Sequence, residues 1–559
     1  MSTGPMSPPP AGSPPLPVLP TSAGSNAPPT PSATETVTVT IDGKAHQIAK
    51  GTNLLEACNA AGANVPFFCY HAGLSSPAVC RQCLVDVQGQ PKPVPSCYTP
   101  VADKMEVTTA SPKILDVRRQ MLEFTLVNHP IDCPICDKAG ECMLQKHYFD
   151  WDGKLARNDG IKVKKAKVVD LGPTIVLDQE RCILCTRCIR VCDEVAGVHQ
   201  LEMAKRGDHE VLTTAPGHEL DNPYSLNTVD VCPVGALTSK DFRFAMRAWE
   251  LYATPSVCTG CATGCNTDVH SSRGQMYRLV PRVNEQVNKH WMCDEGRMTY
   301  KAAHVDRLAA PMSKTGGGAV EWDKALADAT RALRTVLDSG PGRLGVVFNA
   351  QSPNEDLYAL AKLAFDHLGV SKAYLAGRDQ GWSDKILVSA DKNPNTAGAF
   401  AVGAGRLKTL LDLAADLKSG ALGALIVVGT DGVLVGDQAS AAMPLDKLEA
   451  LVVLSTHKNA VTEAAHVALP LAGWAEIDGT FTNKLGMVQR VHPAIPPAGD
   501  ALPGWDILSH LARGMGATME FTTAKAVFVE ASAKLPFMKG AEWGRNVRPL
   551  QLRFANSRG

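Results

Sequence analysis

Fifteen of the seventeen cysteines, together with one histidine, fall into four groups of four possible metal ligands. With the number of intervening residues, the groups are Cys69-x10-Cys80-x2-Cys83-x13-Cys97, His129-x3-Cys133-x2-Cys136-x5-Cys142, Cys182-x2-Cys185-x2-Cys188-x43-Cys232 and Cys258-x2-Cys261-x3-Cys265-x27-Cys293. Iron in a cluster prefers soft thiolate ligands, and the protein must complete the coordination of its irons. Four complete ligand sets predict four clusters, and a row of clusters is a path for electrons.

The distribution of the cysteines favours metal ligation over disulfides. All of them lie at or before Cys293, in a chain of 559 residues. Residues 1–31 lack the basic and apolar regions of a secretory signal, so we expect a cytoplasmic location. In a reducing compartment, clustered cysteines indicate metal binding or catalysis.

Composition excludes several classes of partner. The formal net charge is zero and the pI is about 7.2, which gives no basis for binding nucleic acid or an anionic membrane surface. The longest apolar candidate, around Ala424–Val435, is interrupted by glycines and an aspartate, so we expect no direct membrane insertion. The length predicts several domains.

The first group lies in a segment with β-grasp features. Alternating apolar residues from Val37 lead to a hairpin turn at Asp42-Gly43, and Asn53 is a candidate helix cap. The Cys-x2-Cys…Cys layout matches that of plant-type ferredoxins, although ten residues separate the first two ligands where those proteins have four. We predict a [2Fe–2S] cluster, with a structural zinc site as the alternative.

The second group contains a histidine where a fourth cysteine is missing. Ser111-Pro112 predicts the start of a helix that ends near His129. A lone histidine before a proline is usually a surface residue. Here the three following cysteines lack a fourth ligand, which makes His129 the candidate.

The third and fourth groups predict two [4Fe–4S] clusters, with zinc again the alternative for the fourth. In two-cluster ferredoxins a cysteine at the position of Cys192 ligates the other cluster, but no second local run exists here. We therefore expect Cys232 to be the fourth ligand of the third group and Cys192 to be a buried spare thiol. Cys58 is predicted to be a core residue of a helix.

The character of the sequence changes after Tyr300. Helical patterns alternate there with short apolar runs, which predicts an α/β domain with a largely parallel sheet. The expected helices are 322–337, 356–368 and 407–417, and the expected strands are 344–348, 424–428, 450–454 and 465–469. Gly403-Ala404-Gly405 lacks a third glycine and an upstream strand, so it is not expected to bind a dinucleotide.

These features predict a multidomain α+β and α/β protein with no independent catalytic residues. The expected parts are a disordered Pro-rich tail (1–34), a β-grasp [2Fe–2S] domain (35–110), a [4Fe–4S] module with one histidine and three cysteines (111–152), a ferredoxin-like [4Fe–4S] module (153–248), a further [4Fe–4S] domain (249–305) and a C-terminal α/β domain (306–559).

The order of the four groups, with the histidine-containing set second, resembles the large, 75 kDa-type iron–sulfur subunit of respiratory complex I, the NADH–quinone oxidoreductase of bacteria. The resemblance is strong over about 35–300 and weak afterwards. The matching spans are 66–71, 132–136, 182–188 and 232–237. It implies one [2Fe–2S] and three [4Fe–4S] clusters, the last of them found only in some bacterial members and off the main electron path.

The resemblance also implies partners and a location. Electrons would come from a flavin-bearing subunit that oxidises NADH, pass from the Cys69 group to the Cys182 group and the His129 group, and leave toward quinone through a downstream [4Fe–4S] subunit. The chain would belong to a peripheral arm on the inner face of the cell membrane.

The C-terminal region resembles a reduced molybdopterin-oxidoreductase domain, because residues 479–483 and 486–489 are similar to a motif of that superfamily. Catalytic members bind molybdenum through a cysteine, selenocysteine or serine. No cysteine follows Cys293 and the region is short, so a structural role is expected. The alternatives are a subunit of an NAD-linked formate dehydrogenase or of a hydrogenase, and a zinc-stabilised scaffold.

Overall fold

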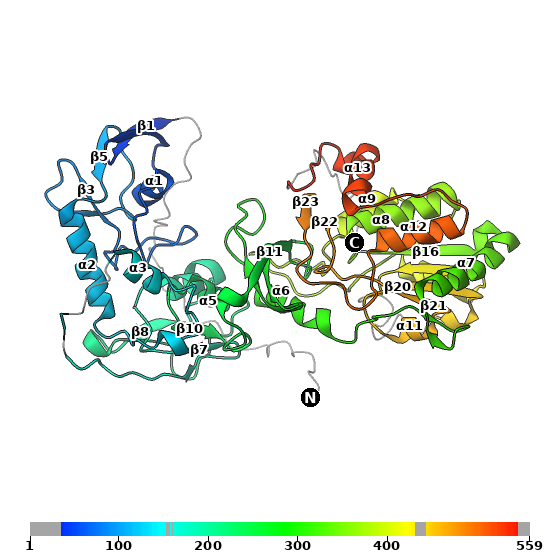
Figure 1. Ribbon diagram of the computed structural model, residues 1–559, viewed down its shortest axis with the longest axis horizontal. Helices are drawn as coiled ribbons and strands as arrows, with labels where there is room; N and C mark the ends of the chain where they lie inside the picture. Colours follow the sequence, from blue (N-terminus) through cyan, green and yellow to red (C-terminus); the bar gives the residue numbers. More distant parts are fainter. Residues whose placement is uncertain (1–34, 152–156, 159, 431–442, 546–559) are drawn as a thin grey trace, which may run out of the picture. The chain divides into compact units, whose positions relative to one another are not determined.

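The computed structural model describes residues 35–151, 157–158, 160–430 and 443–545 (Figure 1). The predicted tail at 1–34 lies outside these residues. The chain forms two compact units that divide after Leu122, and each is described by itself.

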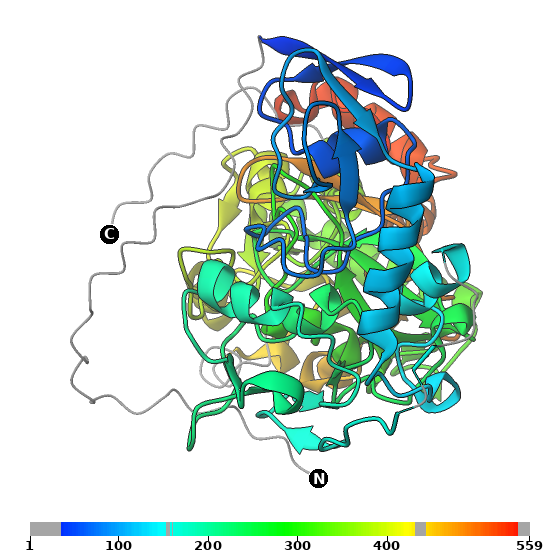
Figure 2. The ribbon, with the colours of Figure 1, turned by 90° about the vertical axis from the view of Figure 1, so that its left-hand side faces the viewer.

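The first unit is a five-stranded sheet with one helix packed on it, as the β-grasp prediction requires (blue in Figure 2). Its elements are β1 (Thr36–Ile41), β2 (Lys44–Ala49), α1 (Leu54–Ala60), β3 (Leu84–Val87), β4 (Val94–Pro95), β5 (Met105–Thr108) and the first part of α2 (Pro112–Leu126). The strand order is β2-β1-β5-β3-β4, with β1 and β5 parallel. Asp42 and Gly43 both have positive φ in the β1–β2 turn, as predicted.

Short elements carry the middle of the chain, which lies in the second unit. They are α3 (Met143–Trp151), β6 (Val169–Asp170), β7 (Ile175–Leu177), α4 (Arg187–Arg190), β8 (Glu202–Ala204), β9 (Val211–Thr213), α5 (Asn227–Val231), β10 (Leu237–Ser239), β11 (Tyr252–Val257), β12 (Asn266–Ser272), β13 (Gln275–Pro281) and α6 (Asp294–Arg297). They form small antiparallel sheets, β10-β7-β6, β8-β9 and β11-β12-β13.

An eight-stranded sheet dominates the C-terminal part, in the order β15-β14-β21-β20-β19-β16-β17-β18. Its strands are β14 (Met312–Ser313), β15 (Gly318–Ala319), β16 (Leu344–Asn349), β17 (Lys372–Ala376), β18 (Leu407–Lys408), β19 (Ala424–Val428), β20 (Ala450–Ser455) and β21 (Val467–Pro470). The six strands from β21 to β18 are parallel, which confirms the predicted sheet.

Helices cover both faces of this sheet. The helices are α7 (Trp322–Ser339), α8 (Asn354–Ala361), α9 (Thr396–Gly403), α10 (Leu410–Lys418), α11 (Ala460–Ala464), α12 (Gly504–Gly514) and α13 (Ala524–Lys534). Neighbouring residues of one strand belong to different cores: Val346 packs with α7, α8 and α12, whereas Val347 packs with α10 and α11. Figure 1 shows α8 and α12 on one side of the sheet and α11 on the other. A hairpin of β22 (Gly479–Thr482) and β23 (Val488–Val491) is separate from the sheet.

Several boundaries differ from the sequence prediction. The helix expected at 356–368 is α8, which begins at Asn354 and ends at Ala361, and residues 362–367 continue it as a π-helix. Helix α10 begins at Leu410 and not at Leu407, because Leu407 and Lys408 pair with β17 as an edge strand and Thr409 caps the helix. The strand expected at 465–469 is β21, which begins two residues later. Residues 403–405 end helix α9 and do not join a strand to a helix, as the rejection of a dinucleotide loop requires.

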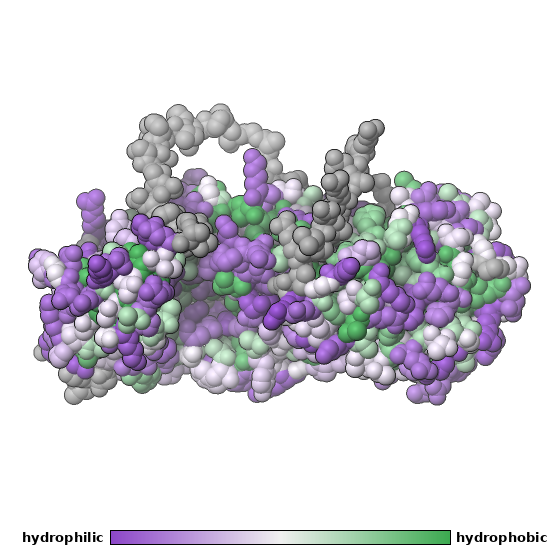
Figure 3. Space-filling view, turned by 90° about the horizontal axis from the view of Figure 1, so that it is seen from above, coloured by the Kyte–Doolittle hydropathy of each residue, from purple (hydrophilic) through white to green (hydrophobic). Residues whose placement is uncertain are grey.

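The surface seen in Figure 3 mixes hydrophilic and hydrophobic residues in small groups. Within the described ranges, no helix has the length and apolar character needed to cross a membrane.

Candidate metal-cluster sites

The first group is built around the N-terminus of α1. The Asn53 side chain accepts from Leu55 N (3.0 Å), capping the helix, and its Nδ2 donates to the carbonyl of Cys97. Ser96 Oγ donates to Cys83 O (2.7 Å), which ties the two ligand positions together. Asn53 therefore starts the helix, as predicted, and also holds the last loop of the group, which sequence analysis did not predict.

The thiols of the first group converge inside the first unit. Cys69 interacts through hydrogen bonds with Cys80 and Cys97, and these contacts hold its pKa well below its usual value. Cys83 interacts in the same way with Cys97. The loop around Cys80 contains Ala78 and Arg81 at φ +53° and +54°, a conformation that costs about 1–2 kcal/mol for a residue with a Cβ. Such strain is typical of functional loops.

The second group begins with a partly buried histidine. Nδ1 of His129 has no hydrogen-bond partner among the described residues. Burial lowers the pKa of this ring to about 4, so it is neutral at neutral pH, which is the metal-binding form of imidazole. A buried nitrogen without a partner needs an explanation, and ligation supplies one.

The rest of the second group is held by charged side chains and short turns. Asp132 accepts two hydrogen bonds from Arg181, at 3.1 and 2.7 Å, and forms an ion pair with Lys167. Cys133 begins a 3-10 turn that ends at Cys136, and Cys142 precedes α3. Arg247 Nη1 donates to Cys136 O (2.9 Å) from a different part of the chain.

In the third group, a strand pair brings distant cysteines together. Strands β7 and β10 are antiparallel, with Leu177 opposite Leu237. Cys182 follows Leu177 at the same spacing with which Cys232 precedes Leu237, so the pairing closes the long gap before the fourth ligand.

A single cavity is lined by Cys182, Cys185, Cys188 and Cys232. Burial raises the pKa of Cys182 to about 12 and that of Cys185 to about 11, so these thiols release their protons only when a metal binds. Cys192 is fully buried but is not among the described residues that line this cavity. The placement agrees with Cys232 as fourth ligand.

The loop of the third group is also strained. Leu184 and Thr186, which flank Cys185, have φ of +55° and +60°. Left-handed residues beside ligands turn successive peptide groups toward a common centre. The Cys-x2-Cys-x2-Cys spacing is consistent with this geometry, although sequence analysis did not predict the two dihedrals.

The fourth group lies at the end of the β11–β12 hairpin. Val257 pairs with Asn266, so the intervening loop carries three of the cysteines, and Cys258 N donates to Cys265 O (2.8 Å). Cys293 caps α6, and its Sγ accepts from Gly296 N (3.3 Å). A second cavity is lined by Cys258, Cys261, Cys265 and Cys293.

Glycine makes room for the sulfurs at two of the sites. A Cβ at Gly296 would lie 2.9 Å from the Sγ of Cys258. A Cβ at Gly235 would lie 2.3 Å from the Sγ of Cys136. Gly235 follows Cys232 of the third group, whereas Cys136 belongs to the second. Met143 N also donates to Pro233 O (2.9 Å), so the second and third groups are neighbours in the structure.

No group of three or more histidine, cysteine or acidic side chains in the described ranges converges on a single metal ion. A cluster distributes its ligands over several irons, so they surround a volume and not a point. The cavities of the third and fourth groups, each lined by four cysteines, have this form.

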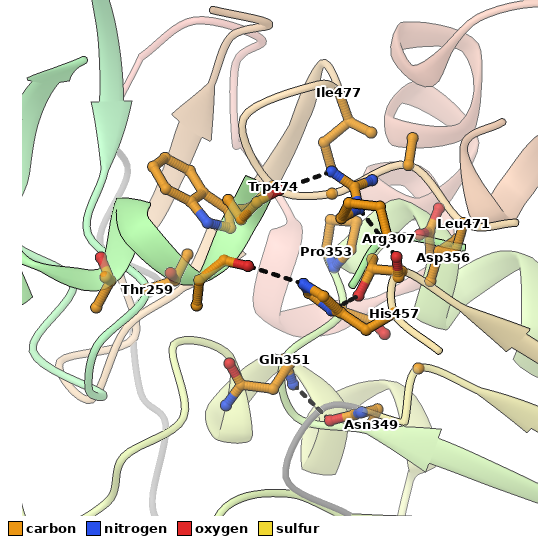
Figure 4. A pocket seen from close by; sticks show the side chains of 18 of the residues that line it. Thr259, Arg307, Asn349, Gln351, Pro353, Asp356, His457, Leu471, Trp474 and Ile477 are labelled. Atoms are coloured by element: carbon orange, nitrogen blue, oxygen red, sulfur yellow. Dashed lines mark hydrogen bonds between the residues drawn. The ribbon is translucent and has the colours of Figure 1, made fainter. Parts of the chain in front are cut away.

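A larger cavity lies elsewhere, at the carboxyl ends of the parallel strands in the C-terminal domain (Figure 4). Its volume is about 600 Å³, and it lies where the strand order reverses between β16 and β19, a common ligand position in such sheets. Arg307 binds Glu476 at 2.5 and 2.7 Å and donates to the carbonyls of Ala303 and Thr456. Nδ2 of Asn349 is buried without a partner among the described residues.

The pocket does not fit a molybdenum bound through a protein thiolate. No cysteine belongs to its described lining, and none follows Cys293 in the sequence. Ser352 supplies a hydroxyl, but its side chain is 5% exposed and its backbone is tied to Asn349 and Asn395.

Five domain families match this chain in the order of its parts. They are a 2Fe-2S iron-sulfur cluster binding domain (34–112), the NADH-ubiquinone oxidoreductase-G iron-sulfur binding region (118–151), the ferredoxin-like domain of NADH-quinone oxidoreductase subunit 3 (172–238), the NDSU1/NuoG-like 4Fe-4S domain (251–301) and molybdopterin oxidoreductase (371–514). The chain is thus an iron–sulfur protein with 2Fe-2S and 4Fe-4S binding domains, and the predicted fold class is confirmed.

Curated relatives make the identification more specific. The G subunit of the NADH-quinone oxidoreductase of Streptomyces coelicolor is 38% identical over 334 residues, which are 59% of this chain and 39% of that protein. The 75 kDa subunit of NADH-ubiquinone oxidoreductase from Reclinomonas americana is 38% identical over 368 residues, 64% of this chain and 53% of that protein. This chain is a relative of the large iron–sulfur subunit of complex I, as the sequence resemblance predicted. It spans about half the length of the curated relatives it matches.

Among solved structures, a chain of an NAD+-reducing [NiFe]-hydrogenase aligns with 38% of this chain at 29% identity. The TM-score is 0.35, which is too low for a comparison of folds.

Proposed function

We propose that this chain is an electron-transfer subunit of an NADH–quinone oxidoreductase. It would receive electrons from a flavin-bearing subunit that oxidises NADH and deliver them to a downstream [4Fe–4S] subunit on the way to quinone. Cluster-to-cluster transfer needs no acid, base or nucleophile, so the chain supplies ligands, spacing and a tuned environment.

The proposed ligands are the sixteen residues of the four groups. One [2Fe–2S] cluster binds Cys69, Cys80, Cys83 and Cys97, and a [4Fe–4S] cluster binds His129, Cys133, Cys136 and Cys142. Two further [4Fe–4S] clusters bind Cys182, Cys185, Cys188 and Cys232, and Cys258, Cys261, Cys265 and Cys293. When bound, the clusters accept and release single electrons.

The observation that carries this proposal is the contact between the second and third groups. Gly235, three residues after Cys232, lies against the sulfur of Cys136. The second and third groups are thus neighbours, which suits direct electron transfer between the clusters that they would bind. This supports a step between the Cys182 group and the His129 group within the proposed order Cys69 group, Cys182 group, His129 group.

The remaining parts follow from the same proposal. The chain would lie in a peripheral arm on the inner face of the membrane, held there by its partners. The C-terminal domain would be structural, because no cysteine belongs to the described lining of its pocket and the guanidinium of Arg307 is already paired with Glu476. A formate dehydrogenase subunit has less support, since the curated relatives described above are NADH dehydrogenase subunits.

Iron and acid-labile sulfide analysis with EPR spectroscopy tests the assignment. We expect about fourteen irons per chain and four distinct reduced signals, three of which appear after addition of NADH to the assembled complex. A colourless, zinc-containing protein would contradict the proposal.

The role of His129 has its own test. His129→Cys should retain a [4Fe–4S] cluster at a lower potential, because an anionic ligand replaces a neutral one. An unchanged potential and EPR spectrum would show that His129 is not a ligand.

A further inference from the structure

The β22–β23 hairpin lies against the cysteine loop of the fourth group, although about 220 residues separate them in the sequence. Residues 479–489 include the motif that resembles the molybdopterin superfamily. In this chain several of its polar groups bind the cysteine loop.

Three consecutive carbonyls of the cysteine loop accept hydrogen bonds from the hairpin. The carbonyl oxygens of residues 262, 263 and 264 accept from Lys484 N (2.7 Å), Asn483 Nδ2 (3.2 Å) and Gln489 Nε2 (2.9 Å). These residues lie between Cys261 and Cys265. The hairpin therefore holds the backbone that joins two of the proposed ligands.

Gln489 is placed by both ends of its amide. Its Oε1 accepts from Asn266 Nδ2 (2.5 Å), while its Nε2 donates to the loop. The side chain is fully buried, so each of these bonds replaces a bond to water. Gly264 has no room for a side chain here, because a Cβ would lie 2.8 Å from Gln489 Nε2. The fit is close and specific to an amide of this length.

Asn483 is fixed by its own turn. Its Oδ1 accepts from Leu485 N (2.9 Å) and Met487 N (3.0 Å), and Gly486 has φ +75°. The side chain is 1% exposed. Because the turn holds Oδ1, the amide of Asn483 is oriented with its Nδ2 toward the carbonyl of Thr263.

Fixing the carbonyls also fixes the amide groups of the loop. A peptide unit is planar and trans, so each N–H points opposite to the carbonyl that precedes it. With three carbonyls bound to the hairpin, the N–H groups of residues 263–265 face the other way, and Gly264 N donates to Cys261 O (3.2 Å).

We infer that Asn483 and Gln489 are positioning residues that hold the Cys261–Cys265 loop in the conformation that binds the fourth cluster. This inference rests on the proposed ligation of that cluster. The polar residues of this motif would thereby serve the neighbouring cluster site.

The test is Gln489→Met in the full chain, within the assembled complex. Methionine has a similar length but makes neither amide bond, so the loop loses its bond at Gly264 and the adjacent strand loses its bond at Asn266. We expect the EPR signal of the fourth cluster to broaden or disappear and iron to fall from about fourteen to about ten per chain. The signals of the other three clusters should keep their shape and their response to NADH.

Thr480→Val is the matched control. Thr480 lies in the same hairpin, but its hydroxyl donates to Glu355 Oε1 (2.8 Å) in α8 and not to the cysteine loop. This variant should weaken the hairpin while leaving the fourth signal unchanged. If Gln489→Met does not fold, Gln489→Glu removes the donor to Gly264 with little change of shape and gives the same spectroscopic test.

The outcomes are distinguishable. A wild-type chain without a fourth EPR signal would overturn the proposed ligation itself. A wild-type signal that stays unchanged in Gln489→Met or Gln489→Glu would overturn the positioning role alone. A loss of the fourth signal in Thr480→Val as well would show that the hairpin acts only through overall stability.

Discussion

The proposed ligands of the cysteine groups and Arg307 in the large pocket of the C-terminal domain are paired in opposite ways. The thiols of the third and fourth groups line their cavities together, and His129 has a buried nitrogen without a partner among the described residues. In the pocket, the guanidinium of Arg307 is neutralised by Glu476 and bound by two carbonyls.

This difference separates sites that require a ligand from a buried ion pair that is stable without one. Buried thiols are stabilised when they lose their protons and bind a metal. A buried ion pair with all its hydrogen bonds made gains little from a further ligand. Changes at the cysteine groups should therefore affect iron and electron transfer, whereas changes in the pocket should affect stability.

Gly235→Ala should have the largest effect, because it acts on two sites at once. The added methyl group would lie 2.3 Å from the Sγ of Cys136 and 3.2 Å from Lys138 Cβ. We expect loss or strong distortion of the second EPR signal and at least a tenfold slower reduction of the downstream partner by NADH.

Gly342→Ala is the control for this variant. No atom lies within 4 Å of a Cβ built there, and its φ is not in the left-handed region. It should change stability by no more than about 0.5 kcal/mol and leave all signals intact. Normal electron transfer in Gly235→Ala would show that the second and third groups tolerate a larger distance between them.

Glu476→Ala should destabilise the C-terminal domain without loss of iron. It leaves the guanidinium of Arg307 buried and unpaired, which costs about 3–5 kcal/mol. The exposed pair of Arg343 and Glu449 is the matched control, since Glu449→Ala should cost only about 0–1 kcal/mol. Urea unfolding followed by tryptophan fluorescence measures both. A fall in iron content in folded Glu476→Ala would contradict the separation of roles.

Parts of both regions could be predicted from local sequence. Asp42-Gly43, the Asn53 cap and Ser111-Pro112 form the predicted turn and helix starts because short-range geometry decides them. The alternation of helical patterns with short apolar runs also predicted the parallel sheet, because a strand buried on both faces is a run of apolar residues. Leu407 was misassigned to a helix, because its pairing with β17 depends on a partner that periodicity does not reveal.

The supporting contacts of the sites could not be predicted in this way. Asn53 and Cys97, Gly235 and Cys136, and Gln489 and Gly264 meet only after the chain has folded. No spacing rule connects residues so far apart. Cysteine spacing identified candidate ligands, whereas the polar groups that hold their loops required the structure.

A smaller effect is expected on the pH dependence of stability, and it comes from Glu355 in α8. Burial raises the pKa of Glu355 from 4.5 to about 8. Between these values the folded state binds a proton that the unfolded state has lost, so stability is fully present below pH 4.5 and falls as the pH rises to 8. Glu355→Gln is neutral at every pH and should reduce the slope by up to about 1.4 kcal/mol per pH unit.

Unfolding of the full chain at about pH 5 to 8 measures this slope. The glutamine can keep both contacts with Thr480, by accepting from its N–H and donating to its hydroxyl. Glu463→Gln, at an exposed position, is the control and should leave the slope unchanged. Asp356, whose pKa burial raises to about 7, should retain part of the slope in the variant.

Cys192→Ser should have the smallest effect and tests the boundary between ligands and core. Its sulfur lies 4.0 Å from Asn222 Nδ2, and the residue is not among those described as lining the third cavity. Serine keeps a small side chain with a hydrogen-bonding atom, so iron content and all EPR signals should be those of the wild type. Cys232→Ser, the paired variant, should lose about four irons. The opposite result, with loss of iron in Cys192→Ser alone, would make Cys192 the fourth ligand in place of Cys232.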